Sequence, residues 1–191
     1  NGSEFLEQGA YPYDSTNYQE VITKMVQIWQ DFSKNTITRV IISNVAGSKL
    51  ADCMGFVVRQ SLALEPNYIA PTKTFKGLKN GYAMHEALGV DRWLNLLGAH
   101  KLLKLEKTPG GFCVISCGTA VTIDAVNSSY NHIGGFIIPG LHLMENSLLD
   151  HTRDIRNKML LQENSNIENK SKKSSYFLAN NTKHAITGGI H

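Results

Sequence analysis

Cysteine is scarce in this chain, and the spacing of the few cysteines excludes two classes of small domain. The 191 residues contain three, Cys53, Cys113 and Cys117. An odd number without a Cys-x-x-Cys pair argues against a disulfide framework and against a zinc site of that type. We expect free thiols in a reducing cytoplasm, with Cys113 and Cys117 serving as small apolar residues in a buried strand.

Long apolar runs and a strong charge of either sign are also missing. No run is long enough to cross a membrane, so we expect no membrane partner. The formal net charge is +3 without a basic stripe, which gives no support for nucleic-acid binding. With 42% hydrophobic and 18% charged residues, the composition is that of an ordinary globular protein.

Several catalytic motifs are absent as well. The seven histidines form no metal-binding pair on a helix, so a transition-metal site is not expected. The sequence has no Gly-x-Ser-x-Gly and no cysteine nucleophile box, which leaves hydrolase chemistry unsupported. Neither a Walker-type phosphate loop nor Gly-x-Gly-x-x-Gly occurs.

The order of the predicted elements favours an α/β architecture, because helical periods alternate with short β-branched runs. The expected helices cover residues 18–33, 47–64, 86–105 and 141–152, and the expected strands cover 39–43, buried on both faces, and 68–70. Loops are expected at 71–82 and 162–175. Asn181 and Thr182 belong to a helix N-cap cluster, and Gly188-Gly189 predicts a turn.

The most informative segment predicts a β-hairpin. An apolar run from Cys113 ends in a Gly118-Thr119 turn, and an alternating run through Thr122 and Asp124 leaves it. A turn this small exposes backbone N–H groups and a hydroxyl, which suits a phosphate, although a plain hairpin is an equal alternative. Since Asp124 beside a phosphate is unfavourable without a cation between them, it is a candidate metal ligand.

Two further segments carry possible chemistry. Asp91-Arg92 stands at a predicted helix start, where Asp91 could accept a hydroxyl proton and Arg92 could hold a carboxylate or phosphate. A helix cap with a surface ion pair is the alternative. Gly134-Gly135 and Pro139-Gly140 flank an apolar strand, which fits either two loops or a close backbone approach to a nucleotide.

As an ordered set, these segments resemble the type III pantothenate kinases. The matching pieces are Ser43–Gly47, Gly77–Tyr82, Leu88–Trp93 with Gly98-Ala99, Gly118–Asp124, Gly134–Leu141, Ser147-Leu148 with Thr152, and Asn181-Thr182 with Ala185-Ile186 and Gly188. The match runs from about residue 37 to 190 with family-like order and spacing.

The resemblance implies a duplicated ribonuclease-H-like, actin-like fold with mixed sheets flanked by helices. It also implies ATP-dependent phosphorylation of pantothenate, the first step of coenzyme A synthesis, with Mg²⁺ and a monovalent cation, K⁺ or NH₄⁺. The family works as a homodimer with the substrate at the interface. By resemblance the base is Asp91, and Asp124 lies near the monovalent cation. The residues that line the pantothenate pocket by resemblance are Tyr82, Gly89, Val90, Asp91, Arg92 and Thr182 of the partner. Those of the nucleotide site are Gly118, Thr119, Thr122, Gly134, Gly135, Pro139 and Gly140.

Two departures from the family pattern keep other functions open. The first phosphate loop, Asp-x-Gly-Asn-Thr/Ser, is not found, and Ser116 replaces the Asp that usually precedes the Gly-Thr turn. A non-catalytic or regulatory relative and a kinase of another acceptor are therefore alternatives. We expect a piece of a longer protein, divided at 1–70 (partial N-terminal domain), 71–111 (connecting segment with the substrate-site helix) and 112–191 (C-terminal domain, truncated).

Overall fold

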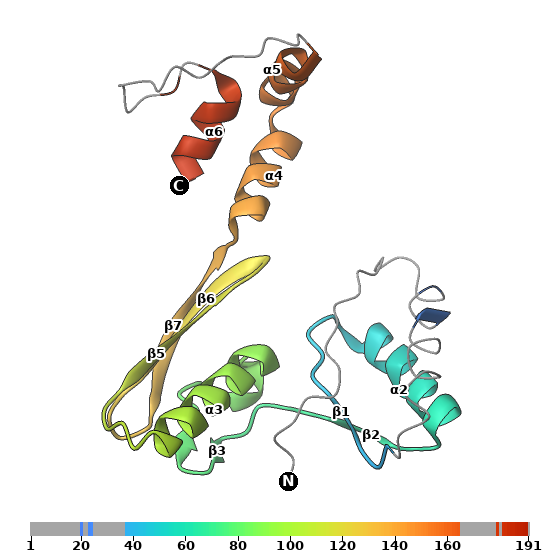
Figure 1. Ribbon diagram of the computed structural model, residues 1–191, viewed down its shortest axis with the longest axis vertical. Coiled ribbons are helices and arrows are strands. Elements are labelled where there is room, and N and C mark those ends of the chain that lie inside the picture. The colour runs from blue at the N-terminus through green and yellow to red at the C-terminus, as the bar shows by residue number, and fades with distance from the viewer. Residues whose placement is uncertain (1–19, 21–22, 25–36, 165–178, 180, 191) are drawn as a thin grey trace. The chain divides into compact units, whose positions relative to one another are not determined.

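The computed structural model describes residues 20, 23–24, 37–164, 179 and 181–190 (Figure 1). Most of the predicted helix over 18–33 lies outside these residues. Glu20, Thr23 and Lys24 are helical, and Lys24 forms an ion pair of 2.6 Å with Glu20, one turn apart. The chain divides into two compact units, residues 1–73 with 82–94 and residues 74–81 with 95–191. Each unit is described by itself.

The first unit is built on a β–α–β arrangement, as the alternating pattern predicts. Strand β1 (Val40–Ile42) pairs in parallel with β2 (Pro66–Tyr68), and helix α2 (Ser48–Leu62) connects them. The apolar face of α2 consists of the buried side chains of Leu50, Val57 and Val58. The prediction that the first strand is buried on both faces is wrong, because the side chain of Ile41 is 58% exposed.

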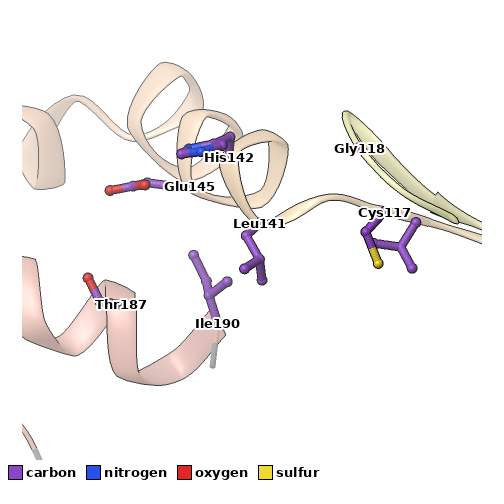
Figure 2. Close-up of a pocket in the computed structure, with 8 residues that line it drawn as sticks. Cys117, Gly118, Leu141, His142, Glu145, Thr187 and Ile190 are labelled. Carbon is purple, nitrogen blue, oxygen red and sulfur yellow. The ribbon is translucent and has the colours of Figure 1, made fainter. Parts of the chain in front are cut away.

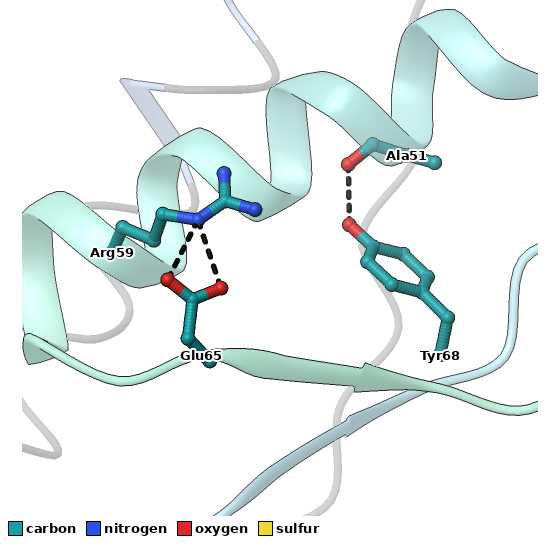
Figure 3. A network of polar contacts seen from close by, with 4 residues as sticks. All are labelled: Ala51, Arg59, Glu65 and Tyr68. Carbon is teal, nitrogen blue, oxygen red and sulfur yellow. Dashed lines mark hydrogen bonds and ion pairs between the residues drawn. The ribbon is translucent and has the colours of Figure 1, made fainter.

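Polar contacts join α2 to β2, which begins at Pro66 rather than Tyr68 as predicted (Figure 3). The Tyr68 hydroxyl donates to the carbonyl of Ala51. A Cβ at Gly55 would lie only 3.0 Å from that hydroxyl, so glycine makes room for the tyrosine. At the other end of the helix, Arg59 Nε donates to the Glu65 carboxylate at 3.0 and 3.1 Å.

Helix α3 (Val90–Leu105) starts four residues later than predicted. The segment before it forms a short 3-10 turn, η1 (His85–Ala87). Gly89 precedes the helix, and its carbonyl accepts the first helical hydrogen bond from the N–H of Trp93 at 3.0 Å. Trp93, Leu96 and His100 follow a helical period and are buried, which fixes the inner face of α3.

The second unit begins with a small hairpin where a loop was predicted. Strands β3 (Thr74–Phe75) and β4 (Leu78–Lys79) pair around Lys76 and Gly77, whose φ angles are both positive. Two positive φ angles are the requirement of a tight two-residue hairpin turn. The Lys76 carbonyl lies 3.2 Å from His100 Nε2 and accepts from Lys104 Nζ at 3.0 Å, which attaches the turn to α3.

A three-stranded antiparallel meander forms the centre of this unit and confirms the predicted hairpin. Its strands are β5 (Phe112–Cys117), β6 (Ala120–Val126) and β7 (His132–Pro139), with β6 in the middle. Cys117 pairs with Val121 across the Gly118-Thr119 turn. Gly134 and Gly135 lie inside β7 rather than in a flanking turn, and Gly134, with φ of +122°, adjoins the register shift between Ala125 and Val126.

One face of the meander is apolar and exposed. The register places Ile115, Ile123 and Phe136 in one row across the three strands. Phe136 is 72% exposed, and Ile115 is exposed too. Cys113 and Cys117, expected in a buried strand, are exposed free thiols on this same face. The opposite face holds Asp124 and Val126, both buried, so the alternation that the sequence predicts is present but the cysteines lie on its open side.

Three helices complete the second unit: α4 (Leu141–His151), α5 (Arg153–Asn164) and α6 (Thr182–Ile190). The predicted bounds of α4, 141–152, differ from the observed ones by one residue at the C-terminal end. Residues 162–164 belong to α5 rather than to the predicted loop, whose remainder lies outside the described residues. Asn181 caps α6 by accepting from the His184 N–H at 2.9 Å, and Gly188-Gly189 is helical, not a turn. Among the described residues, no helix combines the length and apolarity that a membrane crossing requires.

Candidate functional site

Arg92 and Tyr82 form a bonded pair in the first unit. Arg92 stands in the first turn of α3, and only 4% of its surface is exposed. Its Nη1 donates to the Tyr82 hydroxyl at 2.9 Å, and the guanidinium carbon lies 5.7 Å from the centre of the tyrosine ring. A guanidinium held this way keeps a fixed orientation, and its planar set of donors suits a carboxylate. Two of the predicted acceptor-site residues are therefore brought together.

Asp91 is exposed beside this pair, one residue before Arg92 and in the same helical turn. The helix dipole favours a carboxylate at this end of α3. In the described part of the chain, the Asp91 carboxylate makes no hydrogen bond or ion pair, so the alternative of a capping ion pair with Arg92 finds no support. Gly89 and the buried Val90 precede it, and they are the remaining predicted acceptor-site residues of α3 and its start.

The Gly118-Thr119 turn is held against the start of α4 in the second unit. The Gly140 N–H donates to the Thr119 carbonyl at 2.8 Å. A Cβ at Gly140 would lie 2.2 Å from the Gly118 carbonyl oxygen and 2.7 Å from that of Thr119. Only glycine permits this approach, so two of the predicted nucleotide segments, far apart in sequence, meet at one point.

The turn differs in one respect from the open phosphate nest that the sequence suggested. The Gly118 N–H is occupied, because it donates to the Ala120 carbonyl at 3.0 Å. The free N–H groups at this point come instead from the first turn of α4, which begins at Leu141 without a side-chain cap. A helix N-terminus of this kind attracts anions through its exposed N–H groups and its dipole.

A cavity of about 660 Å³ opens next to this turn (Figure 2). Its lining residues come from the hairpin, from α4 and from α6, and they are Cys117, Gly118, Val121, Leu141, His142, Glu145, Thr187 and Ile190. In Figure 2, Leu141 and Ile190 extend from the two helices toward the same space, and Cys117 enters it from the strand. No sequence motif marked Thr187 and Ile190 of α6 as lining residues, since their approach to the hairpin depends on how the helices pack.

Asp124 is paired with His132, a residue that no sequence motif marks. His132 Nε2 lies 2.9 Å from Asp124 Oδ1. The Asp124 side chain is 3% exposed, and the His132 side chain is fully buried. The two residues are brought together because β6 and β7 are neighbours, with His132 opposite Val126. A buried carboxylate is stabilised by such a partner. The strand alternation was the only available signal, since it places Asp124 on the inner face.

The other predicted site residues are distributed over the second unit. Thr122 stands opposite Ser116 on β5 and Ile137 on β7. Gly134 and Gly135 oppose Ala125 and Asp124, and so they lie along β7 away from the turn that Gly140 contacts. Pro139 is the last residue of β7, and Thr182 is the partly buried first residue of α6.

Comparison with known proteins decides the family. The family model described as "Type III pantothenate kinase" matches residues 2–191. The chain belongs to the type III pantothenate kinase family. This confirms the resemblance seen in the motifs, and the match includes the α3 start and the Gly118-Thr119 turn.

Individual relatives agree with this assignment. A type III pantothenate kinase of Nitrosococcus oceani is 31% identical over 155 residues, which cover 81% of this chain and 56% of the relative. One of Pseudomonas fluorescens is 43% identical over 100 residues, 52% of this chain and 38% of the relative. One of Herminiimonas arsenicoxydans is 37% identical over 133 residues, 69% and 49% respectively. The chain thus spans about half the length of the curated relatives it matches.

Proposed function

We propose that this chain takes part in the ATP-dependent phosphorylation of pantothenate, which opens coenzyme A synthesis. The observation that carries the proposal is the family match over residues 2–191, with Asp91 exposed at the start of α3 beside the Arg92–Tyr82 pair. We further propose the duplicated ribonuclease-H-like fold of such kinases; the mixed α/β order of the structure is consistent with it.

The acceptor side would work through charge and position. Pantothenate carries a carboxylate and a primary hydroxyl. We assign its carboxylate to Arg92, whose orientation Tyr82 fixes, because a buried guanidinium favours an anionic partner. We place the hydroxyl against Asp91, which accepts its proton as the oxygen attacks the γ-phosphorus of ATP and ADP leaves on the bridging oxygen. Gly89 and Val90 supply backbone next to Asp91, and Thr182 would come from a second subunit of a homodimer.

The phosphate side would use the junction of the hairpin and α4. The Thr119 hydroxyl and the first N–H groups of α4 are donors of the kind that bind phosphate oxygens, and the Gly140–Thr119 hydrogen bond fixes their separation. The neighbouring cavity has room for the nucleoside end of ATP, a size typical of small-ligand pockets. Thr122, Gly134, Gly135 and Pro139 remain assigned to the nucleotide as predictions.

Two cations belong to the proposal. Mg²⁺ would arrive on the ATP phosphates and neutralise the charge that develops during transfer. Within the described residues no three His, Cys, Asp or Glu side chains gather as a metal site. For K⁺ or NH₄⁺, the oxygen donors on the inner sheet face are of a suitable class: Ser116 and Thr122 are opposite each other, and Asp124 follows on the same face. We keep Asp124 as the proposed ligand.

We place the protein in the cytoplasm, because the use of ATP and free thiols such as Cys113 and Cys117 are consistent with that compartment. A binding protein without catalysis is the second candidate, favoured by Ser116 in place of the family's usual Asp.

Thermal unfolding with pantothenate and with ATP–Mg²⁺, combined with product analysis by mass spectrometry, separates the two. The kinase predicts stabilisation by each ligand and phosphorylation of pantothenate in preference to other hydroxy acids. Stabilisation by ligands without any product would support the binding protein. Equal turnover of a panel of acceptors would contradict the assignment of pantothenate.

A further inference from the structure

Gly89 lies where a side chain would collide with the candidate base. A Cβ at Gly89 would stand 2.6 Å from Asp91 Oδ1, well inside van der Waals contact. The next nearest atoms, Asp91 Cγ and Arg92 Cδ, are at 3.8 Å, an ordinary distance. The space above Gly89 is therefore filled by one atom, a carboxylate oxygen of Asp91.

The Asp91 carboxylate has nothing else to hold it there. Among the residues that the structure describes, it takes part in no hydrogen bond or ion pair, whereas its neighbour Arg92 is bonded to Tyr82. Its rotamer therefore depends on the space that its surroundings leave open. Because Gly89 has no side chain, the carboxylate can fold back over the start of α3.

Glycine at position 89 also leaves α3 without a side-chain cap. Gly89 occupies the residue before α3, and its carbonyl accepts from the Trp93 N–H, as the carbonyl of an N-cap residue does. Serine, aspartate or asparagine at this position would supply a side-chain acceptor for the first turn, and each carries the Cβ that the Asp91 oxygen excludes. Helix capping and the observed Asp91 rotamer therefore require different residues at position 89.

We propose that Gly89 is a positioning residue for Asp91: it keeps the carboxylate in the orientation from which it accepts the proton, and it does so by lacking a side chain. This rests on the proposed function, in which Asp91 is the base. It differs from the role of a pocket wall, in which Gly89 would contact pantothenate directly. The two roles predict different kinetic parameters.

Gly89→Ala and Gly89→Ser test the proposal as a pair. Both add the Cβ that meets Asp91 at 2.6 Å, and a return to ordinary contact at ~3.5 Å moves the carboxylate oxygen by about 1 Å, a misplacement that costs about 100-fold in rate. We expect kcat for pantothenate to fall about 10- to 100-fold in both, with the KM for ATP unchanged. Alanine is a poor N-cap and serine a good one, so the alanine variant should have the lower Tm while the two share one catalytic defect. A loss of kcat that is larger in the alanine variant, in step with its lower Tm, would overturn the proposal.

Gly98→Ala is the matched control. Gly98 lies in the same helix, and an added Cβ meets nothing within 4 Å beyond the helix's own backbone. We expect wild-type kinetics and an equal or higher Tm. If Gly89→Ala raises the KM for pantothenate while kcat is retained, Gly89 is a pocket wall and the proposal is wrong. Wild-type kinetics in both Gly89 variants would also overturn it.

Crystal structures of the wild-type chain and Gly89→Ser give a readout independent of activity. We expect Asp91 in a different rotamer in the variant, with the backbone of α3 unchanged. An unmoved Asp91 carboxylate would contradict the proposal. If the wild-type chain forms no phosphopantothenate, the proposed function fails for this chain, and the rotamer comparison still decides whether Gly89 sets the orientation of Asp91.

Discussion

Replacement of Gly140 by alanine should disrupt the junction on which the proposed phosphate site depends. The new Cβ would lie 2.2 Å from the Gly118 carbonyl oxygen and 3.0 Å or less from two backbone atoms of Thr119. All of these are main-chain atoms, so no side-chain rotation can relieve the collision. Contact at ~3.5 Å requires the turn and the start of α4 to separate by more than about 1 Å.

The cost follows from two contributions. Overpacking of this kind costs about 1–3 kcal/mol, and loss of the Gly140–Thr119 hydrogen bond adds about 1 kcal/mol. The sum, about 2–4 kcal/mol, must appear either as lost stability, if the junction stays closed under strain, or as lost nucleotide affinity, if it opens. At 1.4 kcal/mol per tenfold change, full expression in binding would weaken ATP by about 30- to 700-fold.

Urea unfolding and isothermal titration with ATP–Mg²⁺ measure the two contributions. Gly118→Ala is the control for the steric argument, because its Cβ would meet nothing closer than Ala120 O at 3.8 Å and should leave stability intact. An unfolding free energy within about 0.5 kcal/mol of wild type, together with an ATP affinity within about twofold, would refute the reasoning for Gly140→Ala.

Two further substitutions test the other polar pairs. Tyr82→Phe removes the acceptor of the Arg92 hydrogen bond and should raise the KM for pantothenate while destabilising the chain by about 1.5–3 kcal/mol, measured by steady-state kinetics and urea unfolding; an unchanged KM would show that this bond does not orient the guanidinium. His132→Ala removes the buried partner of Asp124 and should cost about 3–5 kcal/mol in the same unfolding assay, and the double variant with Asp124→Asn should recover part of that loss; equal destabilisation by the single and double variants would mean that no uncompensated charge is involved.

Local patterns in the sequence were sufficient for the hairpin and for helices α2 and α4. The hairpin from Phe112 to Val126 has an apolar run before a Gly-Thr turn and an alternating run after it, and its register is set by that turn. The β3–β4 hairpin was missed because its strands have two residues each and its turn is Lys76-Gly77, not one of the usual Asn-Gly or Asp-Gly pairs.

Non-local contacts could not be predicted in the same way. Gly134-Gly135 resembles a turn in sequence, but neighbouring β6 satisfies its backbone and draws it into β7. The pairing of His132 with Asp124 depends on the register after a bulge, which no local pattern specifies. The approach of Gly140 to Gly118 likewise depends on how β7 ends, so the individual glycines were identified from the sequence but their mutual contact was not.

The most direct test of the account is ATP-dependent formation of 4′-phosphopantothenate by the wild-type chain and by Asp91→Asn, in potassium buffer with Mg²⁺. Asparagine keeps the size of the side chain and removes its basicity, so the account predicts product from the wild type and a fall of about 100-fold or more in the variant. The loss of stability should not exceed the helix-dipole contribution of the charge, about 0.3–1 kcal/mol. Equal rates in the two proteins would contradict the role of Asp91, and no product from a folded wild-type chain that binds ATP would contradict the kinase function proposed for it.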